Sequence, residues 1–237
     1  MAGFLLAGSV RLGKTVGGNI FYPVGETDEC NVEIKTTSIN LPSHEEGTYG
    51  QTIDTVAYPE STEITMTVRD MKRENMAMAF LGNDSNIDIA EGTNEMTLTL
   101  YSGADIRLPH RNISNLSVGS FIEGVDYLPH LRDGFIRVLK TGNIIDGSEQ
   151  LIQYNYGNSK GFVIQGVTKN AITVPLMLNG INLSTQAPIE FYAYEAVLVP
   201  TNGFNFFGKE FVSLKLQGTL KIPYGKTSPF EYRELEI

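Results

Sequence analysis

Cysteine, basic residues and long apolar runs are all scarce in this chain, and each scarcity excludes a class of protein. The single cysteine, Cys30, excludes an intrachain disulfide, so the fold cannot depend on an oxidising compartment. The apolar run at residues 3–8 is too short to span a bilayer, and no basic segment precedes it. We therefore expect a soluble protein that folds in a cytoplasm, without a signal peptide or a membrane partner.

The shortage of basic residues argues against nucleic-acid binding. Lys and Arg total 18 against 27 Asp and Glu, which gives a net charge of −9. A protein that binds the phosphate backbone of nucleic acid needs a concentrated basic surface, and no Lys/Arg run here is longer than Lys72-Arg73. We expect no specific contact with nucleic acid.

Periodicity of two dominates the chain and predicts a mainly β protein. Apolar and polar residues alternate over 96–101, 172–178 and 212–222, and the third row is interrupted only by Gly218, which indicates a bulge or a close backbone approach. The run 189–199 is bulky on both faces and predicts a strand that is covered on both sides. Between residues 103 and 160 turn signals crowd together and predict hairpins, in a small peripheral β-rich lobe.

One helix is expected, over Asp70–Leu81. Asp70 is a suitable N-cap, and Gly82 is a suitable left-handed C-terminal cap. Ala77, Phe80 and Leu81 lie at i, i+3 and i+4 and form a stripe that can cover one side of a sheet.

The segment that precedes this helix is the most informative part of the chain. A short strand at Val32 and Ile34 is followed by an expected long polar loop, Thr36–Glu60, and by an alternating strand, Glu63–Val68. Loops of that length are uncommon in compact domains unless they bind something. The expected loop also carries apolar residues, which could be buried against another protein. We therefore expect the loop to become ordered against another subunit.

A match to the phosphate-binding loop pattern G-x-x-x-x-G-K-[ST] occurs at Gly8–Thr15. That loop requires a helix to begin at its lysine, so that helix amides hold the phosphates. The residues that follow Lys14 include two glycines, β-branched and aromatic residues and Pro23, which predict turn and strand. The motif therefore does not predict nucleotide hydrolysis.

No other constellation predicts catalysis, a cofactor or a metal. His44, His110 and His130 lie in separate polar segments, and Cys30 has no cysteine partner, whereas zinc sites need clustered ligands. The paired acids Asp28-Glu29 and Glu45-Glu46 are typical of solvated surface, although a glycosidase would also use two carboxylates. We predict a protein that is not an enzyme and has no cofactor.

The residues "SHEEGTYGQTIDTVAYPESTEITMTVRDMKRENMAMAFLG" (43–82) resemble the major tail tube protein of bacteriophages with long, flexible, siphovirus-type tails. The resemblance is strongest over residues 32–82 and continues loosely through the C-terminal half. It implies a single tail-tube domain over 1–237: a β-sandwich or partly closed barrel with one flanking α-helix, and with 103–160 as a β-rich middle insertion. It also implies a structural virion protein, made in the host cytoplasm, whose hexameric rings stack into a hollow tube.

The same resemblance implies partners and site residues. The chain would bind copies of itself, the tape-measure protein and tail-tip or terminator proteins, while genomic DNA would cross the lumen without specific binding. Glu60 and Glu63 would face the lumen. The residues expected to reach the next ring are His44, Glu45, Glu46, Tyr49, Gln51, Asp54 and Tyr58. The alternatives are a ring-forming secretion-tube protein and a carbohydrate-binding module of a tail tip.

Overall fold

The computed structural model describes residues 3–235 and is mainly β, as predicted. The chain divides into two compact units. The first, which we call the sheet unit, contains the described residues up to Asp84 and those from Ile164 onward. The second, the inserted unit, is Ser85–Val163.

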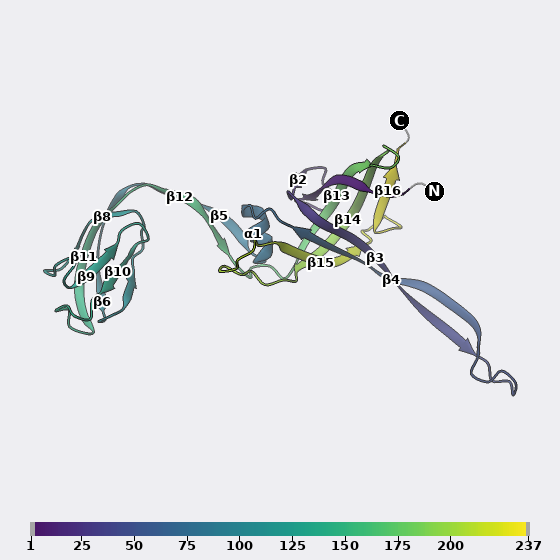
Figure 1. The fold of residues 1–237 in the computed structure, drawn as a ribbon, viewed down its shortest axis with the longest axis horizontal. Helices are drawn as coiled ribbons and strands as arrows, with labels where there is room; N and C mark the ends of the chain where they lie inside the picture. The colour runs from purple at the N-terminus through teal and green to yellow at the C-terminus, as the bar shows by residue number, and fades with distance from the viewer. Residues whose placement is uncertain (1–2, 236–237) are drawn as a thin grey trace. The chain divides into compact units, whose positions relative to one another are not determined.

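An open eight-stranded antiparallel sheet forms the sheet unit (Figure 1). Its strand order is β2-β1-β13-β14-β15-β4-β3, with β16 paired to β14 beside β15. The two ends of this order do not meet, so no barrel closes within residues 3–235. The strands are β1 (Leu6–Gly13), β2 (Phe21–Pro23), β3 (Thr27–Pro42), β4 (Thr52–Val68), β13 (Ile172–Asn182), β14 (Pro188–Pro200), β15 (Leu214–Lys221) and β16 (Phe230–Glu234).

The core lies on one face of this sheet and follows the predicted alternation. Ile64, Met66 and Val68 of β4 are fully buried, as are Leu214 and Leu216 of β15, while the residues between them in β15 are exposed. β14 is the central strand, with β13 on one edge and β15 and β16 on the other. Its Ile189, Ala193, Ala196 and Leu198 are buried, but Tyr192, Val197 and Val199 are partly exposed, so the predicted cover on a second face is not present within residues 3–235. The period of the sequence therefore predicts the strands and the buried faces of β4 and β15.

Gly218 marks a close backbone approach, one of the two predicted possibilities. It pairs with Leu198 on one side and Ile64 on the other, without a register shift. A Cβ at this position would lie 1.8 Å from the carbonyl oxygen of Val197, well inside contact distance. Only glycine fits between these two strands.

The helix is shorter than predicted: α1 spans Arg73–Ala79, not Asp70–Leu81. Lys72 is the N-cap residue and forms no side-chain capping bond. The predicted cap at Asp70 is wrong, because its carboxylate forms an ion pair with Lys72 at 3.3 Å and its carbonyl accepts a bond from Asn75 Nδ2 at 2.5 Å. Met71, Met78 and Ala79 pack against the core of the sheet.

At the other end of α1, Leu81 takes the left-handed conformation (φ 47°) that we predicted for Gly82. The Gly82 amide still closes the turn by donating to Ala77 O at 2.8 Å. Gly82 is needed for a different reason: a Cβ there would lie 2.6 Å from the carbonyl oxygen of Gln165.

The largest correction concerns Thr36–Glu60, which is not a long loop. β3 and β4 stay paired from Thr27↔Val68 to Pro42↔Thr52, with register shifts on the way, so only the residues between these strands form a turn. The segment is rich in Thr, Ile and Val, which favour strands, and the polar residues among them hide the pattern.

The inserted unit has its own core and two three-stranded antiparallel sheets, ordered β6-β11-β8 and β7-β10-β9. It extends beyond the predicted lobe of 103–160 at both ends. β5 and β12 form a separate two-stranded sheet at its two junctions. The strands are β5 (Asn83–Ile89), β6 (Gly92–Leu100), β7 (Asp105–Arg107), β8 (Ile113–Val118), β9 (Tyr127–His130), β10 (Phe135–Val138), β11 (Ser148–Tyr156) and β12 (Ser159–Gln165).

The Asp126 side chain stabilises the turn at residues 122–126 of the inserted unit and links it to Asn143. Its carboxylate accepts hydrogen bonds from the Ile122 amide at 2.8 Å and the Asn143 amide at 2.7 Å, and a third from Asn143 Nδ2. These bonds favour the charged form and hold the pKa of Asp126 below its ordinary value.

Candidate functional site

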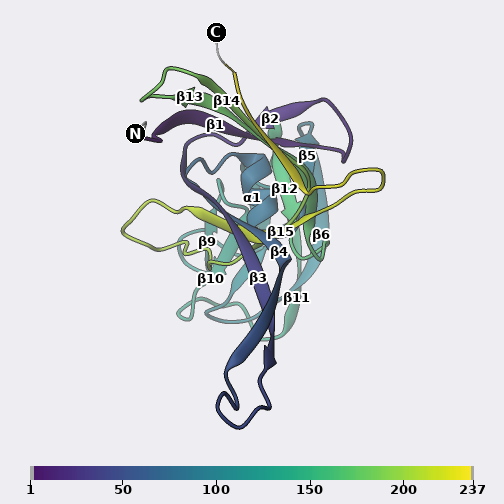
Figure 2. The ribbon, with the colours of Figure 1, turned by 90° about the vertical axis from the view of Figure 1, so that its right-hand side faces the viewer.

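The outer part of the β3–β4 hairpin is the most unusual feature of the sheet unit (Figures 1 and 2). β15 pairs with β4 only over Glu63–Val68, so residues 36–60 pair with nothing except each other. We call residues 36–60 the arm. An isolated two-stranded ribbon is marginally stable in water and normally needs a further strand or layer.

The arm has one apolar and one polar face, because paired residues of an antiparallel ladder share a face. Ile39 pairs with Val56, Thr37 with Tyr58 and Leu41 with Asp54, which brings four large side chains to one face. We call this the apolar face: Ile39, Leu41, Val56 and Tyr58, which are 62%, 57%, 61% and 45% exposed. The opposite face carries Ser38, Asn40, Thr55 and Ala57.

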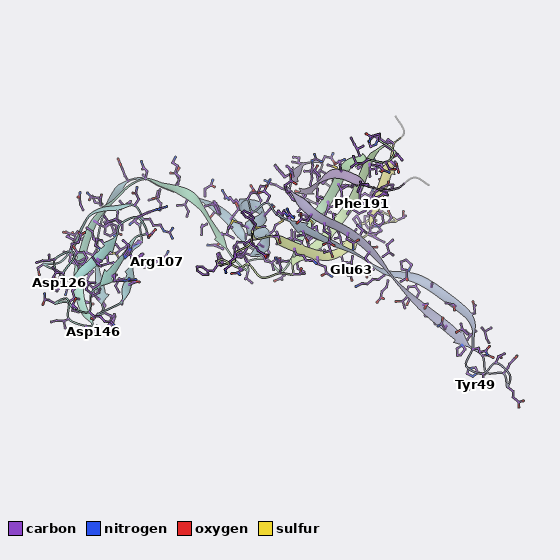
Figure 3. All side chains as sticks on the ribbon, in the orientation of Figure 1. Tyr49, Glu63, Arg107, Asp126, Asp146 and Phe191 are labelled. Carbon is purple, nitrogen blue, oxygen red and sulfur yellow. The ribbon has the colours of Figure 1, made fainter. Side chains whose placement is uncertain are left out.

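The tip of the arm, residues 43–51, is held by its own hydrogen bonds. Ser43 is buried at the tip: its amide donates to Gln51 O at 2.7 Å, and its hydroxyl lies 2.7 Å from that of Thr48. Gly50 donates to Ser43 O at 2.9 Å. Tyr49 projects from this turn, 75% exposed, with its ring against His44 (Figure 3).

The structure thus brings the predicted inter-ring residues together on one arm. His44, Glu45, Glu46, Tyr49 and Gln51 lie in the tip, whereas Tyr58 belongs to the apolar face and Asp54 pairs with Leu41 of that face. The tip is a hydrogen-bonded turn before any partner binds, so the expectation of a segment that is loose until contact does not describe it.

The two predicted lumen acids lie near the base of the arm and have partners. Glu63 is on the face of β4 opposite the buried Ile64, and its carboxylate accepts a hydrogen bond from Lys35 Nζ at 2.5 Å. That bond raises the pKa of Lys35. Glu60 accepts a bond from the Thr37 hydroxyl at 2.6 Å. Lys215, at the register of Thr67, adds a positive charge to the face of Glu63, so this face carries both signs.

A pocket of about 420 Å³ lies in the sheet unit beside α1. Its apolar lining comes from Leu12, Val24, Ala77, Met78, Ile172 and Val174, and its charged lining from Lys14, Lys72 and Lys169 together with Glu74 and Asp84. Lys14 is in the turn after β1, with its ammonium 4.7 Å from the centre of the Tyr22 ring, and no helix begins there. Sequence reasoning missed this pocket because its lysines come from three distant segments.

The histidines and the cysteine have other surroundings. His110 Nδ1 lies 2.9 Å from the Tyr154 hydroxyl, its ring stacks on Tyr156, and His130 stacks on Phe135. Burial raises the pKa of the Cys30 thiol to about 11, and the charge of Glu29 adds to the shift. Within residues 3–235, no three His, Cys, Asp or Glu side chains are grouped to hold a metal ion. No helix in that range is long and apolar enough to cross a membrane.

Comparison with known proteins places most of the chain in one family. A family model described as a protein of unknown function, UCP028589, matches residues 3–226. No curated protein matches the chain.

Proposed function

We propose a structural, self-assembling function for this chain, which belongs to the family UCP028589. Copies of it would polymerise into stacked hexameric rings that form the tube of a bacteriophage tail, with the genome crossing the lumen. The apolar face of the arm carries this proposal, because four large side chains stand on a ribbon that has no covering layer of its own.

The physical reason is the cost of leaving such a face in water. Full burial of one aliphatic side chain contributes about 1.5–3 kcal/mol, and more than half of each of Ile39, Leu41 and Val56 is still exposed. A contiguous exposed apolar surface marks an interaction site in soluble proteins. A second copy of the chain can cover this apolar face, and such a copy is present in every cell that makes the protein.

The open edge of the sheet supports the same proposal. β3 is the last strand in the order, and within residues 3–235 no strand pairs with its outer edge. A long edge strand presents unpaired N–H and C=O groups and is a template for pairing with another chain. Sixteen residues of β3 offer this edge. Edge pairing between copies would join sheets side by side within a ring.

The remaining details of the tube rest on the resemblance to tail tube proteins. The mixed-charge face with Glu63 and Lys215 would line the lumen. The net charge of the whole chain, −9, would disfavour DNA adhesion to the tube within a screening length of about 8 Å. The tape-measure protein would occupy the lumen before ejection, and tail-tip and terminator proteins would close the ends.

Sedimentation velocity and negative-stain electron microscopy over a concentration series test this function. We expect rings or hollow filaments from the intact chain. A variant in which Asn-Gly replaces residues 36–60, so that Lys35 and Ser61 are joined by a tight turn, should stay monomeric and still unfold cooperatively on heating. A single monomeric species from the intact chain at every concentration would overturn the proposal.

A further inference from the structure

We infer that the tip of the arm of one copy seats in the lysine-rimmed pocket of a second copy, with Tyr49 as the inserted side chain. This inference rests on the proposed self-assembly and names its receptor site. It follows from three properties of the sheet unit: the chemistry of the pocket, the shape of the tip, and the distance between the tip and the pocket, which lie at opposite ends of the β3–β4 hairpin.

The pocket suits an aromatic side chain with an acidic surround. Its floor contains Leu12, Ala77, Met78 and Ile172, and its volume of about 420 Å³ accommodates one aromatic ring with neighbouring backbone. Three lysines and two acids line the pocket, which leaves it with a net positive charge. Lys14 and Lys169 are exposed, and neither forms an ion pair with an acid among residues 3–235 of its own chain, whereas the acid Asp84 pairs with Arg73 and the acid Glu74 is exposed. Lys72 lines it too, but donates to Pro23 O and pairs with Asp70.

The tip has the complementary features. Tyr49 is 75% exposed and projects from a turn that is already fixed by hydrogen bonds, so little conformational freedom is lost on docking. Glu45 and Glu46 lie in the same turn, shortly before Tyr49 in the chain, and both are exposed. Tyrosine is enriched among the residues that dominate interface energies. Opposite charges around such an anchor select the partner and its orientation.

The hairpin separates the tip from the pocket of its own chain. Pro23 and Val24, which line the pocket, come just before β3, and Lys72 comes just after β4. The tip lies at the other end of the same ladder, and the sixteen residues of β3 span about 50 Å at about 3.3 Å per residue. Tip and pocket are therefore different surfaces, so their contact can be repeated head-to-tail from one copy to the next, as a stack of rings requires.

Photo-cross-linking from the tip tests this contact. Tyr49→p-benzoylphenylalanine keeps an aromatic group at the tip, and a mixture of isotopically heavy and light full-length chains identifies adducts between copies by mass spectrometry. We expect adducts between the tip and pocket residues such as Met78 or Ile172 of another copy. If assemblies form but the adducts lie outside the pocket, this inference is wrong and the proposed self-assembly remains. If neither adducts nor assemblies form, the inference and the proposed self-assembly are both wrong.

Charge exchange tests the electrostatic part. The tip variant Glu45→Lys/Glu46→Lys and the pocket variant Lys14→Glu/Lys169→Glu should each raise the concentration needed for assembly by about tenfold or more. Mixed in equal amounts, the two should assemble together, because each tip then meets a pocket of opposite charge. The control Lys140→Glu/Lys209→Glu removes the same charge at residues outside the pocket. Equal assembly of all variants, or no recovery on mixing, overturns the inference.

Discussion

Replacing the apolar face of the arm by threonine should block assembly without unfolding the protein. In the variant Ile39→Thr/Leu41→Thr/Val56→Thr the new residues keep a high strand propensity, and the ladder bonds of β3 with β4 remain. The three original side chains are 57–62% exposed in the single chain, so they contribute little to its own stability.

The magnitude follows from the area that remains exposed. If full burial of each side chain contributes about 1.5–3 kcal/mol, the exposed part contributes about 1–2 kcal/mol, or about 3–5 kcal/mol for the three together. Because about 1.4 kcal/mol corresponds to a factor of ten, the concentration required for assembly should rise by about 10²- to 4 × 10³-fold.

Sedimentation velocity over a dilution series measures this concentration, and thermal unfolding checks the fold. The control Ser38→Thr/Ala57→Thr places the same residue type on the opposite face of the arm and should assemble like the parent. Assembly of the triple variant at the parent's concentration, or an equal loss of assembly in the control, would refute the prediction.

Three predictions concern the two units themselves. Gly218→Ala should destabilise the sheet unit by about 3 kcal/mol or more in urea unfolding, since its Cβ would meet the backbone of Val197, while exposed Gln217→Ala should change stability by less than about 0.5 kcal/mol. The Cys30 thiol, with a pKa of about 11, should react with iodoacetamide at pH 8 about 10²-fold more slowly than in the unfolded chain, and equal rates would contradict its burial. Because the pKa of Asp126 is lowered, its bonds stabilise the inserted unit above the unfolded-state pKa of about 3.9, and this contribution is lost as the pH falls through the lower, folded-state pKa. Asp126→Asn should therefore weaken the acid dependence of thermal unfolding between pH 5 and 2, and an unchanged dependence would count against these bonds.

Alternation of apolar and polar residues is enough to predict the core strands. The buried rows of β4 and β15 follow from residue types at i and i+2, because a strand with one buried face has little freedom of register. The close approach at Gly218 is also predictable, since a glycine that interrupts an apolar row of a strand usually marks a bulge or a neighbouring backbone.

Other features depend on neighbours that a single sequence does not reveal. Thr36–Glu60 alternates as Ile39 and Leu41 against Ser38 and Asn40, and as Val56 and Tyr58 against Thr55 and Ala57, but these runs are short, and the polar and turn residues between them favour the interpretation as a loop. The predicted helix ends are wrong because Asp70 has a nearer ionic partner in Lys72, and because Gly82 is required by the Gln165 backbone and not by its own φ. The pocket requires the fold, since Lys14, Lys72 and Lys169 meet only after β1, α1 and the segment before β13 are placed.

The pairing of β5 with β12 makes the inserted unit a candidate for replacement by another folded module. Chain entry and exit lie on adjacent strands, and its core contains only its own residues. Exchange of one folded module for another is tolerated at sites where the two ends of the module are close together. A different module grafted between Asp84 and Ile164 would appear once per copy, so the proposed polymer would become a regularly spaced scaffold for displaying enzymes or antigens.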